Sequence, residues 1–419
     1  MFLESLRLDG LLSFAPGTPA TALGNLNVLI GPNGSGKSNF LEAIDLMRAA
    51  PRALAQAIRD GGGMREWLWK GPRPREAVDG DSAEGPDPAD GRGEGDRTGF
   101  GFAAATLDAR LLRPRRSTLR YYLKIAALDI RPEVVDEGLE EAQKNEPRAK
   151  DVYFYYRFQH GRPALNVREP GSDESKKRRL KRESLVPDES VLSQRRDPDL
   201  YPELTWAASQ FERIQVFRDW TFGRYSLLRQ PQPADLPGDS LLSDARNLGL
   251  VLNRIEHGPR AARFGELLRR FLPRFQRTST LVEGGHVQFF LHEDRCDRPI
   301  PATRLSDGTI RFMALCAALL APTPPPLLCI EEPELGLHPD AMAILADLLV
   351  EASTRMQIIL ATHSDALVSA FTDRLESVLV CEHSGGTQLR RLESARLQHW
   401  LADYRLGDLW RIGELGGNP

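Results

Sequence analysis

Several features that mark particular protein classes are scarce in this 419-residue chain. The net charge of −3 predicts no general attraction to polyanions. The longest apolar stretch, residues 312–330, is interrupted by PTPPP, and the opening residues MFLESLRLDG do not have the pattern of a signal peptide, so we expect a cytoplasmic protein with no membrane partner. Cysteine is rare, and the four cysteines form no CxxC pair: Cys296, Cys316, Cys329 and Cys381. We therefore predict free thiols rather than disulfides or a zinc site, and we expect the three that lie in apolar segments to be buried.

One glycine-rich stretch, in contrast, has a specific pattern. Residues 31–39 read GPNGSGKSN and follow the apolar run at 26–30. They fit GxxxxGK[ST], and apolar residues at helical spacing come next, so the loop is expected to lead from a strand into a helix. Backbone N–H groups in such a loop surround phosphate oxygens, while the helix start adds positive charge. The alternative is a strand-to-helix turn with a chance lysine.

We therefore predict that this loop binds a nucleotide. Lys37 would meet the β and γ phosphates, and Ser38 would offer its hydroxyl to Mg²⁺. The predicted nucleotide-binding residues of the loop are Gly31, Pro32, Asn33, Gly34, Ser35, Gly36, Lys37, Ser38 and Asn39.

Two adjacent carboxylates end a second apolar segment. Residues 327–334 read LLCIEEPE, which predicts a strand that delivers Glu331 and Glu332 at its end. A nucleotide hydrolase needs one group there for the metal and one for water, so Glu331 is the candidate metal ligand and Glu332 the candidate general base. A strand that simply ends in solvated acids is the alternative.

Two further segments carry candidate residues. Residues 305–312, LSDGTIRF, open a predicted helix, so Ser306 and the amide of Gly308 lie at a positive helix end. Residues 357–364, QIILATHS, predict a strand that ends near His363 and follows the acidic strand by one helix, expected at 339–352. His363 is therefore a candidate catalytic residue, although a lone histidine is more often structural.

Taken in order, GPNGSGKS, LSDGT, IEEPE, GLHPD and ATHS resemble the phosphate loop, signature, acidic strand (Walker B), D-loop and switch histidine of ABC-type ATPase heads. The chain is similar to stand-alone AAA ATPases of the RecF, SMC and OLD-like branch. The resemblance implies an α/β fold, an ABC-type P-loop head with a mixed sheet, an antiparallel β subdomain and a strand-rich insertion. It also implies ATP and Mg²⁺ as ligands, and a homodimer in which Ser306 and Gly308 reach the ATP bound by the other subunit.

The chain departs from that pattern at three positions. Asp307 stands where the signature usually has glycine, Thr309 where it has glutamine, and Glu331 where many relatives have aspartate. No Q-loop glutamine is identified. These departures leave two functions open: an ATP hydrolase whose dimer opens and closes in DNA-related work, or a slow-turnover scaffold or sensor that restrains a partner protein.

The pattern also predicts how the chain is organised. We expect an N-terminal lobe with the phosphate loop at 1–70, a mobile acidic Gly/Pro loop at 71–98, an inserted α/β region at 99–212, and a C-terminal lobe at 213–419. Alternation predicts antiparallel strands at 119–127 and 151–159, a strand at 213–219 and a hairpin at 278–292.

The partners are less defined. The basic stretch KKRRLKR at 176–182 is interpreted either as a nucleic-acid contact or as a solvated loop. The 56 residues after His363 are too few for the Toprim nuclease domain of OLD-type proteins. By the same resemblance, a separate nuclease or other effector in defence against phage or plasmids would therefore be another chain.

Overall fold

A computed structural model describes residues 1–72, 103–128, 131–144, 151–159, 162–168, 175–179, 184–218, 220–221, 223–393, 397 and 399–416. Its centre is a six-stranded sheet in the order β10-β15-β16-β3-β17-β18. The first five strands are parallel and the last is antiparallel, so the sheet is mixed. The strands are β3 (Leu26–Ile30), β10 (Gln215–Phe217), β15 (Leu327–Glu331), β16 (Gln357–Ala361), β17 (Val378–His383) and β18 (Thr387–Arg391).

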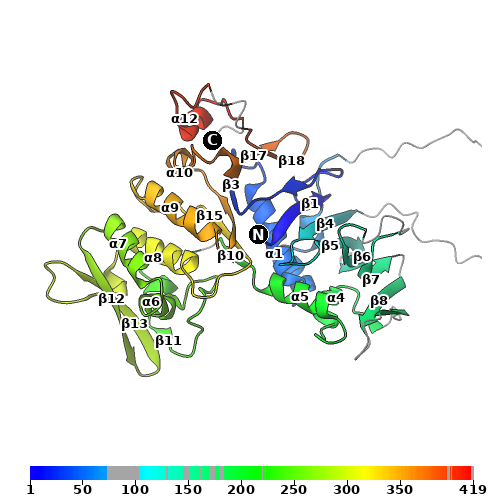
Figure 1. Cartoon of the computed structure of the whole chain (residues 1–419), viewed down its shortest axis with the longest axis horizontal. Helices are drawn as coiled ribbons and strands as arrows, with labels where there is room; N and C mark the ends of the chain where they lie inside the picture. Colours follow the sequence, from blue (N-terminus) through cyan, green and yellow to red (C-terminus); the bar gives the residue numbers. More distant parts are fainter. Residues whose placement is uncertain are drawn as a thin grey trace, which may run out of the picture.

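The central sheet is covered on both faces, as continuous apolar strands require. Val28 and Ile30 of β3 pack in the same core as α8 (Asp307–Leu319) and α9 (Ala341–Ser353). Leu29 between them belongs to a second core, with α1 (Lys37–Ala49) and an antiparallel sheet. Figure 1 shows these layers on opposite sides of β3 and β15.

That antiparallel sheet has eight strands in the order β2-β1-β4-β5-β6-β7-β8-β9. Its formation follows from period-two alternation: in β5, Leu119, Tyr121, Leu123 and Ile125 are all buried. The two predicted antiparallel strands are confirmed as β5 and β7. The strands are β1 (Leu3–Asp9), β2 (Thr21–Ala22), β4 (Ala104–Leu111), β5 (Leu119–Leu128), β6 (Arg131–Glu141), β7 (Phe154–Gln159), β8 (Arg162–Arg168) and β9 (Ser175–Arg179).

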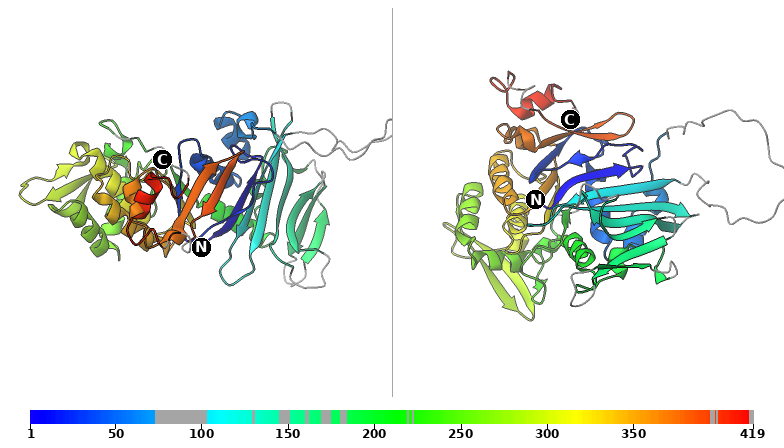
Figure 2. Two further views of the ribbon diagram at one scale, coloured as in Figure 1. Left: turned by 90° about the horizontal axis from the view of Figure 1, so that it is seen from above. Right: turned by 45° about the vertical axis from the view of Figure 1, so that its right-hand side comes forward.

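The strand-rich region does not stand apart from the first lobe. Strand β4 pairs with β1, so residues 3–9 and 104–111 share one sheet. Figure 2 shows this sheet beside the central one. The domain limits themselves stay a prediction, and the predicted mobile loop at 71–98 lies, apart from its first two residues, outside the described ranges. Residues 176–179 of the basic stretch form part of β9, and the remainder of that stretch is outside the described ranges.

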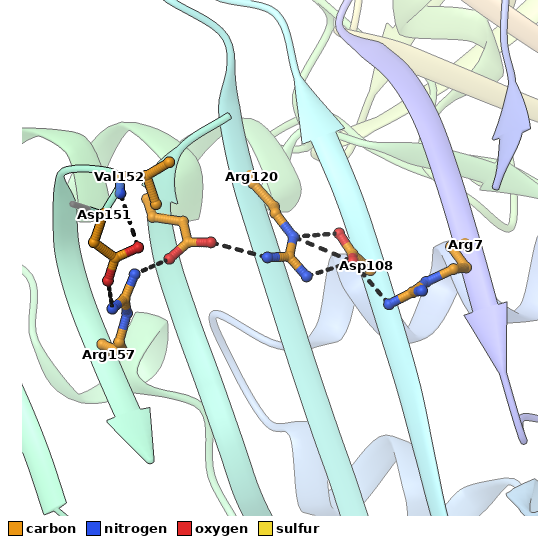
Figure 3. A network of polar contacts seen from close by, with 7 residues as sticks. Arg7, Asp108, Arg120, Asp151, Val152 and Arg157 are labelled. Atoms are coloured by element: carbon orange, nitrogen blue, oxygen red, sulfur yellow. Dashed lines mark hydrogen bonds and ion pairs between the residues drawn. The ribbon is translucent and has the colours of Figure 1, made fainter. Parts of the chain in front are cut away.

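A polar network connects five strands of the antiparallel sheet (Figure 3). Arg120 donates to Asp108 at 2.8 Å and to Glu140 at 2.9 Å. Arg7 extends the network from Asp108 at 3.2 Å, and Arg157 extends it from Glu140 at 2.6 Å. Arg157 also donates to Asp151. Three guanidinium groups thus face three carboxylates, and these ion pairs stabilise the pairing of the strands. Because their charges are balanced within the sheet, these arginines are poor candidates for binding phosphate groups.

A smaller sheet and two helices complete the region around α8. The predicted hairpin is confirmed: β12 (Phe275–Glu283) pairs with β13 (His286–Glu293) and the turn is Gly284 and Gly285, both with positive φ. The remaining strands of this smaller sheet are β11 (Gln232–Pro233) and β14 (Ile300–Pro301). The two helices are α6 (Leu248–Glu256) and α7 (Ala261–Phe271).

The remaining helices lie elsewhere in the chain. They are α2 (Leu54–Asp60), α3 (Met64–Trp67), α4 (Val191–Gln194), α5 (Pro202–Glu212), α10 (Asp365–Ser369) and α12 (Leu406–Arg411).

Two sequence predictions concern burial and membrane contact. Cys316, Cys329 and Cys381 are buried free thiols, as predicted, whereas Cys296 is exposed. Within the described ranges, no helix combines the length and the apolar character needed to cross a bilayer.

Candidate nucleotide site

Three parallel strands bring the predicted site residues to one edge of the central sheet. Glu331 of β15 is level with Ala361 of β16, which is level with Leu29 of β3. The phosphate loop therefore begins beside the two adjacent carboxylates and the segment that carries His363. The carboxyl edge of parallel strands is the usual ligand site of such sheets.

The phosphate loop has a backbone that only glycine adopts readily. Gly31, Gly34 and Gly36 have φ angles of 151°, 77° and 103°. A Cβ atom at Gly31 would lie 2.2 Å from the carbonyl oxygen of Cys381, and one at Gly36 would lie 2.1 Å from Oγ1 of Thr387. The loop is therefore fitted closely against the hairpin of β17 and β18.

Two side chains of that hairpin donate hydrogen bonds to the same backbone carbonyl of the loop. Thr387 donates its hydroxyl to the carbonyl oxygen of Ser35 at 2.8 Å, and Cys381 donates its thiol to the same oxygen at 3.2 Å. The hydroxyl of Ser35 is itself buried and has no hydrogen-bond partner within the described part of the chain. An unpaired buried donor in a glycine-rich loop fits a bound anion, so these residues are compatible with a nucleotide phosphate.

Lys37 lies inside the loop rather than in solvent. Its Nζ donates to the carbonyl oxygens of Gly31 at 2.7 Å and Pro32 at 3.0 Å. Burial lowers the pKa of Lys37, and the nearby carboxylates of Glu331 and Glu332 oppose that shift. The Lys37 ammonium thus lies where it would contact a phosphate held by the loop.

The two oxygens of Glu331 have different partners. Ser38 donates its hydroxyl to Oε1, and Arg218 donates Nε to Oε2 at 2.9 Å. Ser38 and Glu331, the two predicted metal ligands, are therefore adjacent. Arg218 was not among the predicted residues, although the predicted strand at 213–219 placed it at a strand end. Strand β10 pairs in parallel with β15, which brings Arg218 to the same edge.

Glu332 has an unusual backbone. Its φ is 45°, in the left-handed region that costs energy for any residue with a Cβ, and its N–H donates to the carbonyl oxygen of Ala361 at 2.8 Å. Its own carbonyl accepts a hydrogen bond from the buried guanidinium of Arg311 in α8. The backbone at Glu332 is thus fixed from both sides, which sets the direction in which the carboxylate leaves the strand.

His363 is positioned by a third carboxylate, which was not predicted. Glu334 accepts hydrogen bonds through Oε1 from the hydroxyl of Thr362 at 2.7 Å and from the N–H of His363 at 2.9 Å. Burial, together with the charge of Lys37, lowers the pKa of the His363 imidazole. This shift favours the neutral form of the ring.

The predicted signature residues lie at the start of α8, on a different element from the loop. Ser306 is the exposed N-cap of α8, and its Oγ accepts the N–H of Thr309 at 3.1 Å. A Cβ atom at Gly308 would lie 2.7 Å from the carbonyl oxygen of Gly336, which places the signature against the D-loop. His338 of the D-loop is exposed and accepts the N–H of Asp340 just before α9.

Comparison with solved structures defines the class of fold. The chain resembles an SMC head bound to the C-winged helix domain of ScpA, with a TM-score of 0.55, 14% identity, and coverage of 94% of this chain and 99% of that one. It also resembles the SMC head with an extended coiled coil from Pyrococcus furiosus, with a TM-score of 0.53, 13% identity, and coverage of 96% and 99%. The predicted α/β fold, an ABC-type P-loop ATPase head with mixed and antiparallel sheets, is confirmed.

Sequence comparison gives the family. The chain belongs to the family described as "AAA domain, putative AbiEii toxin, Type IV TA system", which matches residues 26–369. A shorter similarity, 45% identity over 58 residues, is to the zinc import ATP-binding protein ZnuC of Ruegeria pomeroyi, and it spans 14% of this chain and 22% of the length of that protein. The predicted kinship with AAA ATPases is confirmed by this family, and the likeness to SMC heads is one of fold.

Proposed function

We propose that this protein binds ATP with Mg²⁺, hydrolyses it, and forms a head-to-tail homodimer around the bound nucleotide. The observation that carries the proposal is the meeting of Lys37, Ser38, Glu331, Glu332 and His363 at one edge of three parallel strands. Nucleotide binding has further support from the unpaired Ser35 hydroxyl in the loop.

Each side chain has a role that its position supports. Lys37 would exchange its two carbonyl partners for β- and γ-phosphate oxygens. Ser38 and Glu331 would hold Mg²⁺, which neutralises charge on the phosphates. Glu332 would orient the water that adds to the γ-phosphorus as the bond to ADP breaks. His363 is held through its backbone by Glu334, and its surroundings favour the neutral ring; it would donate a hydrogen bond to the γ-phosphate.

The signature residues support the dimer. Ser306 is exposed at the positive end of a 13-residue helix, where nothing in its own phosphate loop bonds to it among the described contacts. The Ser306 hydroxyl and the Gly308 amide would then bind the γ-phosphate held by the second copy. ATP would thus be part of the interface, and its hydrolysis would open the dimer.

The wider role we propose is DNA-related work or defence against phage or plasmids, with a separate effector such as a nuclease. The family name supports this, since it refers to a toxin of a toxin–antitoxin system. One of the similar structures is an SMC head bound to a domain of ScpA, which supports the use of a protein partner. Contact with nucleic acid would involve the basic stretch at 176–182.

A second candidate function is a slow-turnover scaffold or sensor that restrains a partner protein. It is favoured by Asp307, which stands where the signature usually has glycine and whose carboxylate is bonded to Arg229 and to the N–H of Gly223. A side chain at this position would alter the contact of the signature with a partner's phosphate. Comparison of ATP turnover with and without DNA distinguishes the two functions.

The test of the dimer uses two variants and light scattering with ATP and Mg²⁺. Glu332→Gln keeps the size of the side chain but removes the base, so turnover should fall by roughly 10² to 10⁴ while ATP stays bound. This variant should remain dimeric, and increasingly so as ATP is raised. Ser306→Arg should stay monomeric, because a bulky cation would occupy the interface.

The matched control is Thr354→Arg. Thr354 is exposed at the far end of α9, away from the carboxyl edge of the sheet. The Thr354→Arg protein should dimerise on ATP as the unchanged protein does. A Glu332→Gln protein that keeps its nucleotide-free mass, or a Ser306→Arg protein that dimerises on ATP, contradicts the head-to-tail dimer.

A further inference from the structure

We propose that Arg218 is a positioning residue that competes with the divalent cation for Glu331, and so sets how tightly the site holds Mg²⁺. This inference rests on the proposed function of the same site. It assigns a role to a side chain that follows β10 and belongs to none of the recognised motifs.

The geometry places Arg218 against the candidate metal ligand. Its Nε donates to Oε2 of Glu331 at 2.9 Å, while Ser38 holds Oε1. A second carboxylate, Glu42 of α1, lies 3.9 Å from Nη1 of the same guanidinium. Arg218 thus lies between two carboxylates, one of which is the predicted metal ligand.

The charges explain why guanidinium and metal compete. Burial raises the pKa of Glu42, and the charge of Arg218 opposes that shift, so the guanidinium favours an ionised carboxylate at this edge. Mg²⁺ also binds carboxylate oxygens, and it demands a close, nearly octahedral arrangement of oxygen ligands. A guanidinium bonded to Oε2 occupies one of the two oxygens that Glu331 could offer to the metal. Metal binding through that oxygen must therefore break or rearrange the Arg218–Glu331 contact.

The surroundings permit that rearrangement. The side chains of Arg218, Glu331 and Glu42 are 26%, 18% and 28% exposed, so a displaced guanidinium reaches water and leaves no buried unpaired charge. Glu42 offers it an alternative partner nearby. A fully buried pair would instead be fixed, because separating it would leave a buried charge without a partner.

The experiment measures metal affinity directly, with Mn²⁺ as the probe. Mn²⁺ binding to the protein in the presence of saturating ATP is followed by electron paramagnetic resonance, and ATP binding in EDTA is followed by calorimetry. Arg218→Gln should bind Mn²⁺ about 3- to 10-fold more tightly, because a partly exposed charge pair no longer competes. Its affinity for ATP in EDTA should be unchanged.

Two further variants make the result specific. Arg218→Lys restores a positive charge and should return the Mn²⁺ affinity toward that of the unchanged protein. Arg270→Gln is the control, since Arg270 of α7 pairs with Asp347 of α9 on the protein surface, and it should change neither affinity.

The outcomes separate this inference from the proposed function. Unchanged or weaker Mn²⁺ binding by Arg218→Gln would overturn the proposal that Arg218 competes with the metal. An equal change in ATP affinity with and without metal would also overturn it, because Arg218 would then be a phosphate ligand. If the unchanged protein binds no ATP under any condition, the proposed function itself is wrong and the inference falls with it.

Discussion

Arg229 and Asp307 form an ion pair of 2.5 Å that joins the turn at η3 (Leu227–Arg229) to the start of α8. The guanidinium is almost fully buried and also donates to the carbonyl oxygens of Ala302 and Leu305. Asp307, which departs from the usual signature glycine, therefore neutralises a buried cation. Its carboxylate is held by this pair and by the N–H of Gly223.

Replacing Asp307 by glycine should destabilise the protein. The change removes the charged partner of Arg229, so we expect the free energy of unfolding to fall by about 1 kcal/mol, a modest value because the Asp307 side chain is 47% exposed. Urea unfolding at pH 7 measures this. The control is Asp347→Asn, which weakens an exposed pair with Arg270 and should change stability far less. Equal stability of Asp307→Gly and the unchanged protein would show that the pair contributes nothing.

Replacing Lys37 by alanine should abolish most nucleotide affinity and leave the fold intact. Lys37 is the cation that the phosphate loop encloses, and its present partners are two backbone carbonyls of that loop, so its removal leaves no side chain without a partner. Calorimetric titration with ATP and Mg²⁺ should show at least a 10-fold loss, as expected for removal of a charged hydrogen bond of roughly 1.5 to 3 kcal/mol. Lys70→Ala, at an exposed pair with Glu66, is the control. Equal affinity in both variants would remove the phosphate-loop assignment.

Glu137 should make stability depend on pH near neutrality. It is buried in β6, and although Tyr121, Ser190 and the N–H of Val191 donate to it, burial raises its pKa to about 7. A carboxyl whose pKa is higher in the folded state than in the unfolded one favours folding most when protonated. The stability that it contributes is thus complete below about pH 4.5 and is lost progressively up to about pH 7.

The full size of that change is roughly 3 kcal/mol, from the pKa difference between the folded and unfolded states. Unfolding by urea at several pH values from 5 to 8 measures it for the unchanged protein and for Glu137→Gln, in which the slope attributable to this group should vanish. Glu133→Gln, on the same strand, should keep the original slope. A pH profile of Glu137→Gln that matches the unchanged protein would contradict the assignment.

Removing the basic stretch should weaken any binding of nucleic acid. Glutamine at its six cations should lower affinity and flatten the dependence on salt, by about 0.9 in the logarithmic slope for each duplex phosphate contact that is lost. Fluorescence anisotropy at several salt concentrations measures both. The control carries glutamine at Arg269 and Arg270 of α7. In Figure 1 this helix lies far from β8, the strand that pairs with β9 of the basic stretch. An unaltered slope would mean that the side chains of the basic stretch are solvated and contact no nucleic acid.

The parts of the site that were predictable from the sequence are local. The loop at 31–39 and the acids at 331 and 332 follow buried strands directly, so the strand pattern and the motif spacing were enough to place them. The helix expected at 339–352 is α9 (Ala341–Ser353), a shift of two residues at its start, because His338 and Asp340 form a turn first.

The arginines were not predictable, because their partners are distant in the chain. Arg218 bonds to Glu331 across 113 residues and Arg229 bonds to Asp307 across 78. Neither spacing forms a motif, and each contact depends on which strands are neighbours. The parallel pairing of β10 with β15 decides the first contact, and a strand of three residues gives little signal of its partner.

The position of β3 between β16 and β17 has a consequence for biosynthesis. The phosphate loop is made early, but the thiol that holds its Ser35 carbonyl belongs to Cys381, 346 residues later. At ribosomal rates of about 5 to 20 residues per second, roughly 20 to 70 seconds separate the two. A nascent chain would thus contain the complete phosphate-loop sequence long before it can hold that loop in shape, and a product cut short before β17 would lack both the loop's support and a neighbouring strand of β3.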